Sequence, residues 1–239
     1  MNRIAFISAL SQGFRNFTKA RLQGIRLSGY LLENLTMGQS HWKNASLYAT
    51  RFFHVDLSDA SFQNAALNKA LFRTCTMTHC SFQEASLSEA VFSGCKLDGA
   101  DFRKAESLHE ASMVECSLNG ALFTEQSMAG IRLVAVDLTG ADLAKANLSN
   151  ASLRSANCTN ANLSGACFDS ADITGINLSG ADLRKADLQN VYGVRANLSS
   201  ADLRGANLNG ALLYGADLRG AKVTAAELKG ADLSEALRD

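Results

Sequence analysis

Large apolar residues recur at every fifth position along almost the whole chain. The spacing begins at Phe17 and Leu22 and continues to Phe102, then resumes at Leu108 and continues to Leu233. A small residue, most often Ala, usually stands two places before each of them, and polar residues fill most other places. An α-helix buries residues with a period of 3.6 and a β-strand with a period of 2, so neither produces this pattern.

A coiled path explains a period of five. If each five-residue block forms one side of a square coil, its first and third residues point inward, and the small first residue fits beside the large third one. Four blocks close a coil of 20 residues, and the chain has 18 blocks before and 26 after the interruption, enough for 11 coils. Coils stacked at the spacing of paired strands would form a column of about 53 Å. The pattern therefore predicts an all-β fold, a quadrilateral parallel β-helix of about 11 coils.

The interruption and the two ends set the boundaries of this prediction. One extra residue, assigned to Ala105, separates the two runs, and we interpret it as a one-residue bulge at a corner. Residues 1–14 lack the pattern and are expected to form an N-terminal cap, a short helix that covers the core of the first coil. Residues 15–235 form the single β-helix, and residues 236–239 form a C-terminal tail.

The repeating unit resembles that of a known family. The blocks Ala-Asp-Leu-Arg-Gly at 201–205 and 216–220 and Ala-Asn-Leu-Asn-Gly at 206–210 are similar to the unit of pentapeptide-repeat proteins. The resemblance covers residues 15–235 and implies a right-handed, four-sided β-helix. Some relatives mimic B-form DNA and protect type II topoisomerases such as gyrase, and others are secreted bacterial effectors, so the resemblance does not fix a function.

One side of the predicted column differs from the other three. On the side with the core residues Leu32, Phe52 and Ile173, ten of 22 outward positions are large and apolar, against one or two on any other side. They are Leu31, Phe53, Leu71, Val91, Val114, Val134, Tyr192, Val194, Leu212 and Tyr214. Contiguous exposed apolar surface usually marks a partner. We expect this side to bind a protein partner, and a second copy of the chain is one candidate. The alternative is that the apolar residues are scattered over this side without a function.

Within this side, two features complicate the prediction. Four outward residues interrupt the apolar series and could divide it into two patches: Ser152, Arg154, Asp172 and Thr174. In addition, Gly193 stands where a large core residue belongs. This predicts either a small void in the core or a bulge that turns Val194 inward.

Composition and charge narrow the choice of partner. Positive and negative residues balance at 23 each, which disfavours nucleic acid. The apolar stretch from Ile4 to Leu10 is too short to span a bilayer, so we expect no membrane partner and a cytoplasmic protein. Residues 1–54 nevertheless hold seven Lys or Arg and one Glu, which predicts a basic tip. That tip is either a solvated end or a site for an acidic partner.

Residues able to perform chemistry do not converge. Cys75, His79 and Cys80 have a spacing like that of metal ligands, but the register turns both thiols inward and the imidazole outward. Cys75, Cys95 and Cys116 fall in one row and should pack as small apolar residues in a reducing compartment. No metal site, cofactor site or catalytic residue is therefore expected, and the chain is not expected to be an enzyme.

Polar outward residues also align in rows. Asp142, Asp182 and Asp202 share a side with Arg184 and Arg204, and we interpret them as ion pairs that alternate from coil to coil. A second row is expected to bond amide to amide between coils, and it consists of Asn157, Asn177 and Asn197. Both rows predict a stabilising surface and not a catalytic one.

Together these features predict a non-catalytic protein-binding, scaffold or regulatory protein that presents a rigid face to a protein partner. A DNA-mimicking protector or inhibitor of gyrase is the alternative, although relatives of that kind look strongly acidic and this chain is neutral. A secreted bacterial effector is a further alternative, which the lack of a separate N-terminal domain disfavours.

Overall fold

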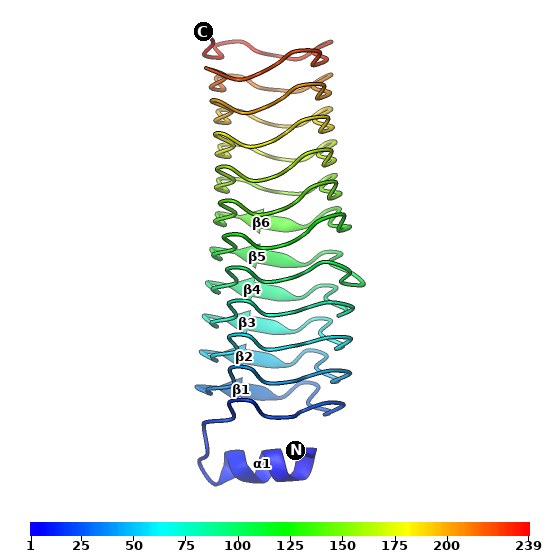
Figure 1. The fold of residues 1–239 in the computed structure, drawn as a ribbon, viewed down its shortest axis with the longest axis vertical. Coiled ribbons are helices and arrows are strands. Elements are labelled where there is room, and N and C mark those ends of the chain that lie inside the picture. Colours follow the sequence, from blue (N-terminus) through cyan, green and yellow to red (C-terminus); the bar gives the residue numbers. More distant parts are fainter.

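The chain winds into one column of stacked coils. The computed structural model describes all 239 residues, from a helix at one end of the column to the C-terminus at the other (Figure 1). Parallel bridges join residues 20 apart along the column, as in Asn157 to Asn177 to Asn197, and they fall in four rows. Each coil therefore uses four five-residue blocks. The prediction of an all-parallel β-helix is confirmed.

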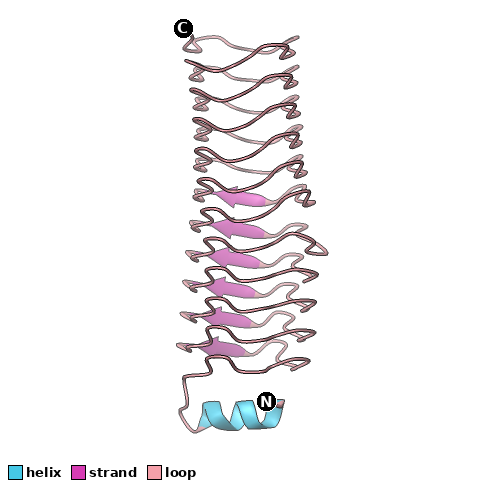
Figure 2. Ribbon diagram, in the orientation of Figure 1, coloured by secondary structure: helices cyan, strands magenta, loops and turns pink.

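Regular strands are confined to one row of the lower coils (Figure 2). They form a single parallel sheet in sequence order and comprise β1 (Leu31–Glu33), β2 (Arg51–Phe53), β3 (Leu71–Arg73), β4 (Val91–Ser93), β5 (Ser112–Val114) and β6 (Arg132–Val134). Elsewhere single bridges alternate with tight turns. The fifth residue of most blocks has a left-handed backbone, with φ of 69° at Gly205 and 53° at Asn190. Gly and Asn adopt this conformation most readily, which explains their frequency there.

Stacked aromatic rings fill the middle of the lower coils. Ring centroids of Phe52 and Phe72 lie 4.6 Å apart and those of Phe72 and Phe92 lie 4.8 Å apart, with nearly parallel planes. A second stack rises from the opposite wall and consists of Trp42, Phe62, Phe82, Phe102 and Phe123. The two stacks meet edge to face, at 6.3 Å between Phe62 and Phe72, a favourable arrangement for aromatic pairs. The interior is thus solid, one cluster of 75 buried residues.

A helix, α1 (Arg3–Ser11), covers the first coil and lies across the end of the column (Figure 2). The amide of Ala5 donates to the side chain of Asn2 over 2.9 Å, which caps the first turn. Phe6 is fully buried and packs edge to face on Phe17, with ring centroids 4.8 Å apart. The apolar side of the helix therefore closes the core. None of the helices has the length and hydropathy that crossing a bilayer requires.

The inserted residue lies one place later than the sequence indicated. Ala105 occupies an ordinary inward position and is buried, whereas Glu106 is exposed at a bend and takes the additional place. The amide of Glu106 donates to the carbonyl of Ala85 over 3.0 Å, a bond that the next residue, Ser107, would make in a regular coil. The assignment of the extra residue to Ala105 is thus corrected to Glu106.

This insertion interrupts one row of bridges. Ser107 bridges to Ser86 below it, and Ser127 bridges to Asn147 above it, but no bridge joins Ser107 to Ser127. The carbonyl of Ala105 would otherwise lack a partner. It accepts a hydrogen bond of 2.9 Å from the side-chain amide of the buried Gln126. A side chain thus replaces a backbone bond that the insertion removes.

Removing the central ring of the first aromatic stack tests the core. We expect Phe72→Ala to lower the free energy of unfolding by about 3–5 kcal/mol, because a fully buried ring is lost and the coils above and below restrict collapse. Phe14→Ala is the matched control, since Phe14 is exposed, and it should have little effect. Denaturant titration followed by circular dichroism measures both. Equal effects of the two substitutions would contradict the stacked core.

A second substitution tests the repair at the insertion. We expect Gln126→Ala to destabilise the protein by about 1–3 kcal/mol, because the buried carbonyl of Ala105 loses its donor. Gln23→Ala, at an exposed position, serves as the control. Amide hydrogen exchange should also rise around Ser107 and Ser127 in the Gln126→Ala protein alone. Unchanged stability and exchange would show that Gln126 does not hold the interrupted row together.

Candidate functional site: an apolar face along the column

All ten residues singled out as a docking face lie on one side of the column. This side, called the apolar face, consists of the outward residues of β1 to β6 and of the coils above them as far as Ser234. Strand pairing aligns its lower part, since Leu71 pairs with both Arg51 and Val91 in adjacent coils. Single bridges continue the row upward, and Tyr192 bridges to Leu212. The period of 20 residues thus places side chains more than 180 residues apart in the chain on the same side of the column.

Solvent reaches these residues to different extents. Tyr192 is 54% exposed, and Leu31, Val91, Leu212 and Tyr214 are also exposed. The remaining five are half-buried by their neighbours, and they are Phe53, Leu71, Val114, Val134 and Val194. Between residues 15 and 220, the single exposed large apolar side chain on any other side is Tyr48. Apolar exposure along the column is therefore concentrated on this face.

The apolar face consists of two patches. The lower patch extends from Leu31 to Val134, and the upper patch contains Tyr192, Val194, Leu212 and Tyr214. Between them Arg154 and Asp172 form an ion pair with an N to O distance of 3.5 Å. Charged and hydroxyl side chains thus divide the surface, as the sequence suggested. The lower patch also carries three Arg side chains without an ion-pair partner, namely Arg51, Arg73 and Arg132.

In the upper patch, Gly193 occupies the third, inward position of its block. The amide of Gly193 donates to the carbonyl of Leu212 over 2.8 Å, so the regular register is kept and Val194 stays outward. The predicted alternative of a bulge is therefore wrong. A Cβ atom at Gly193 would lie 2.7 Å from Leu213 Cδ2 and 3.3 Å from Ile173 Cγ1. Core side chains of the adjacent coils occupy the space that a larger residue would need.

Polar rows cover the other sides. Asn177 donates to Asn157 over 3.2 Å and Asn197 donates to Asn177 over 3.0 Å, which confirms the predicted amide row. The ion pairs differ from the prediction. Arg184 and Arg204 each fold back on the Asp of their own block, as in Arg204 with Asp202 at 2.6 Å, instead of alternating between coils. The hydrogen bond from Arg204 lowers the pKa of Asp202 to about 2, so this pair is ionised at neutral pH.

Cys75, His79 and Cys80 do not form a metal or catalytic site. Cys75 and Cys80 are buried and His79 is exposed, so the three side chains do not converge. Burial raises the pKa of the Cys158 thiol to about 12 and raises that of Cys80 as well. Because the thiolate is the reactive form, these thiols are poorly suited to nucleophilic chemistry. No three His, Cys, Asp or Glu side chains lie where they could hold a metal ion.

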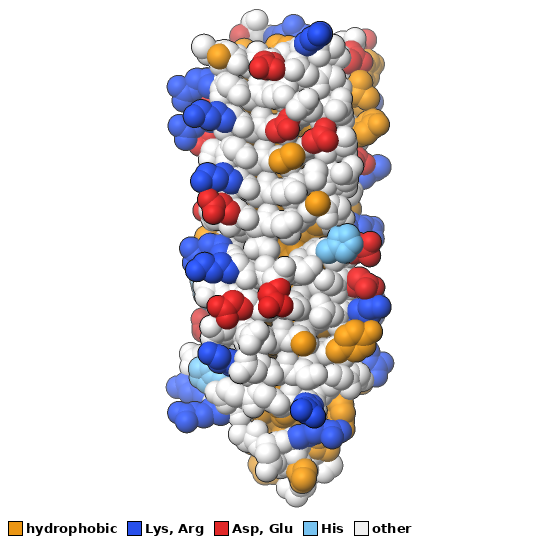
Figure 3. Space-filling model, turned by 90° about the vertical axis from the view of Figure 1, so that its right-hand side faces the viewer, with side chains coloured by type: hydrophobic (Ala, Val, Ile, Leu, Met, Phe, Trp, Pro, Cys, Tyr) orange, Lys and Arg blue, Asp and Glu red, His pale blue; other side chains and the backbone are white.

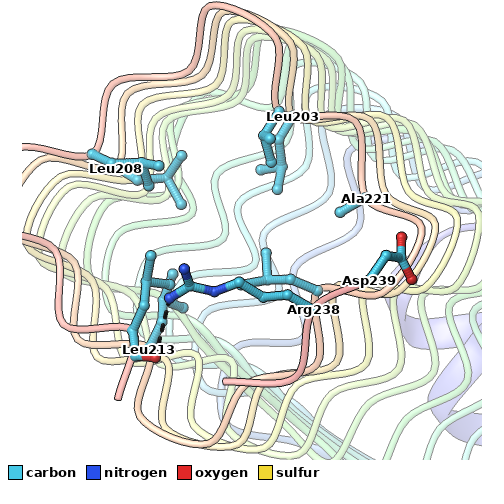
Figure 4. Close-up of a pocket in the computed structure, with 10 residues that line it drawn as sticks. Leu203, Leu208, Leu213, Ala221, Arg238 and Asp239 are labelled. Atoms are coloured by element: carbon cyan, nitrogen blue, oxygen red, sulfur yellow. Dashed lines mark hydrogen bonds between the residues drawn. The ribbon is translucent and has the colours of Figure 1, made fainter. Parts of the chain in front are cut away.

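A hollow at the C-terminal end is a feature that the sequence analysis missed. Its volume is about 230 Å³, and Figure 4 shows it facing out of the last coils, with Arg238 lying across it. The lining includes Leu203, Leu208 and Leu213, which belong to the core. Val223 and Leu228 in the same coils are exposed. The apolar third positions of the blocks after residue 217 were the signal, since Leu218, Val223 and Leu228 line the hollow.

Charge is also distributed unevenly along the column. Lys and Arg side chains appear along the whole column in Figure 3, and acidic side chains appear among them everywhere except toward the N-terminal end at the bottom. None of the seven Lys and Arg in residues 1–54 forms an ion pair, whereas such pairs recur from Lys69 onward. The basic tip predicted from the sequence is therefore a region of unneutralised positive charge.

Comparisons with known proteins identify the repeat. Two family models match, one described as pentapeptide repeats over residues 131–169, 168–192 and 196–234, and one as a pentapeptide repeat region over residues 35–106. None of the curated proteins has a matching sequence. Among solved structures, the chain is similar to QnrB1, a plasmid-mediated fluoroquinolone resistance protein. That likeness has 19% identity and a TM-score of 0.54, and covers 94% of this chain and 90% of QnrB1.

Two further solved structures are similar in sequence but superpose less well. HetL, a pentapeptide repeat protein involved in heterocyst differentiation regulation in the cyanobacterium Nostoc, is 29% identical. The alignment covers 99% of this chain and 96% of HetL, with a TM-score of 0.45. A pentapeptide repeat protein from the thylakoid lumen of Arabidopsis thaliana is 37% identical, over 42% of this chain and 63% of its own, with a TM-score of 0.25.

Thiol labelling tests the inward register of the cysteines. Five of the six are buried, and Cys167 alone is partly exposed. We expect a maleimide reagent at neutral pH to modify one thiol per folded chain and all six after denaturation. Cys167→Ser should abolish the fast reaction, whereas Cys158→Ser should leave it unchanged. Rapid labelling of several thiols in the folded protein would contradict the assigned register.

Proposed function

Since this chain belongs to the pentapeptide-repeat family, we propose that it is a non-catalytic protein-binding protein whose working surface is the apolar face. One observation carries the proposal. Between residues 15 and 220, every exposed large apolar side chain except Tyr48 lies on this one side. Exposed apolar surface has a cost in water, and burying it against a partner recovers about 25 cal/mol per Å². A protein partner fits such a surface better than a small molecule does, because the face is extended.

The upper patch is the better anchor of the two. Tyr192 and Tyr214 are exposed and lie beside Leu212. Backbone hydrogen bonds join the coils that carry them to the adjacent coils, so the backbone beneath these side chains is rigid. Tyrosine is enriched among the residues that contribute most to binding, since a rigid ring buries much area and its hydroxyl group can still find a partner. Rigid presentation also lowers the entropy lost on association.

The surface charges do not favour a DNA mimic. Such a protein needs an excess of free carboxylates, whereas acidic and basic residues balance at 23 each in this chain, and four Asp side chains form ion pairs within their own blocks with Arg103, Arg184, Arg204 and Arg219. The likeness to QnrB1 concerns the fold alone. A gyrase supercoiling assay with and without the protein tests this alternative, and inhibition or protection would replace the proposal made here.

Charge introduced into the upper patch tests the proposal. We expect Leu212→Asp with Tyr214→Asp to abolish capture of the partner from a lysate of the organism that encodes the chain. Two desolvated carboxylates oppose burial of the face, and the loss should exceed about tenfold. The matched control is Asn207→Asp with Asn209→Asp, which places the same charges at the same block positions of the same coil, one side away. Quantitative mass spectrometry of the retained proteins measures the difference.

Three outcomes are informative. A protein retained by wild type and control but lost by the patch variant supports the proposal. If sedimentation shows that wild type and control form dimers and the patch variant does not, the partner is a second copy of this chain. If both variants retain the same proteins as wild type and the same mass in solution, the apolar face is not a binding surface.

A further inference from the structure

The N-terminal tip combines two properties. It exposes apolar side chains at the outermost point, and it concentrates positive charge directly behind them. Ile4 of α1 is 82% exposed and Phe14, just after the helix, is 59% exposed. No Asp or Glu precedes Glu33, whereas Arg and Lys residues are frequent in the same stretch. Neither property alone identifies a partner.

The orientation of α1 explains the exposure. Phe6 is buried against the first coil, and residues two places apart on an α-helix point about 200° apart, so Ile4 projects away from the column. Ile7 is half-buried at the edge of the same outward side. Because α1 lies across the end of the column, its outward side faces along the long axis (Figure 1). The tip therefore presents Ile4 end-on, with the exposed Ser8 and Ser11 beside it on the same outward side.

Positive side chains surround this surface in the first two coils. Arg15, Lys19, Arg21 and Arg26 belong to the first coil and are exposed, and Lys43 follows in the second. Arg3 is held beside the helix by Tyr30, whose hydroxyl accepts from its guanidinium over 2.6 Å. These groups make no ion pairs. Their charge is thus available to an external anionic surface.

We propose that the N-terminal tip docks end-on to an anionic lipid surface, with the outward side of α1 at the level of the headgroups. Short helices with an apolar side and cationic neighbours bind in this way, and each Lys or Arg near an anionic leaflet adds to the attraction. Few apolar side chains are present, so neither insertion nor charge suffices alone and the contact is reversible. The expectation of no membrane partner rested on the lack of a spanning segment, and contact at the surface needs none.

The apolar side chains favour lipid over nucleic acid. Phosphate groups of DNA or RNA would satisfy Arg21 and Arg26, but they offer nothing to Ile4 or Phe14, which would stay in water. A lipid interface removes these side chains from water while its phosphates meet the cations. The proposal is independent of the apolar face, which lies along the side of the column and stays accessible when the tip is bound.

Vesicle flotation with the full chain tests this proposal. Two probes are compared at about 0.1 M salt: phosphatidylcholine vesicles, and the same vesicles with about a third of phosphatidylglycerol. We expect binding to the anionic vesicles alone. Ile4→Ser with Phe14→Ser, and separately Arg21→Glu with Arg26→Glu, should each weaken it about tenfold or more. Lys222→Glu with Lys229→Glu makes the same charge change at the other end and should bind like wild type.

All substituted positions are exposed, and thermal unfolding by circular dichroism verifies that each variant is folded. Equal binding of wild type to neutral vesicles would overturn the proposal. Unchanged binding of either tip variant would overturn it too, because both charge and apolar contact are required. A short duplex DNA is the third probe. If wild type binds the duplex but not the vesicles, and Arg21→Glu with Arg26→Glu abolishes the binding to the duplex, the tip is a nucleic-acid site instead.

Discussion

Parallel hydrogen bonding between coils is the constraint on which the rest of this structure depends. Each rung joins residues 20 apart, so a residue's place in its block decides whether it is buried, turned or exposed. The backbone then accepts small residues at the first place, large apolar ones at the third, and residues that tolerate a left-handed backbone at the fifth. Because bonds and side-chain stacks involve adjacent coils only, stability accumulates coil by coil.

The same constraint shapes the surface. Outward side chains stand in rows at the spacing of paired strands, about 4.8 Å, and cannot move apart without breaking rungs. The rows therefore behave as fixed arrays, of amides in one place, of Asp and Arg pairs in another, and of Leu, Val and Tyr on the apolar face. A single insertion disturbs this order at one rung. The column tolerates it because Glu106 leaves the ladder and Gln126 supplies the lost donor.

The five-residue period alone predicts most of the fold and of the apolar face from the sequence, because the period decides which residues share a row. The β-helix, the aromatic stacks and the common side of residues as distant as Leu31 and Tyr214 follow from counting in fives and twenties. The exceptions depend on local choices that counting does not see. The extra residue could be Ala105 or Glu106, since either leaves the spacing intact, and hydrogen bonds decide. Similarly, an Arg beside a row of Asp residues can pair with the Asp of its own block or with that of the next coil, and the rotamer of the Arg side chain decides which pair forms. The sequence also did not predict that Leu213 fills the space at Gly193, because this depends on how side chains of neighbouring coils pack.

Separation of the surfaces follows from the shape of the molecule. The basic tip faces along the axis and the apolar face lies along the side, so two partners could bind without competing for residues. Coupling between them through the column would require many rungs to change together, and closely packed interiors resist gradual deformation. The upper patch lies some eight coils above α1, counted in steps of 20 from Leu32 to Gly193. A partner at the tip would therefore fix the orientation and position of the apolar face and leave its affinity for a second partner unchanged. That is the physical property expected of a rigid scaffold, and it distinguishes one from an allosteric switch, which needs two alternative arrangements of the same contacts.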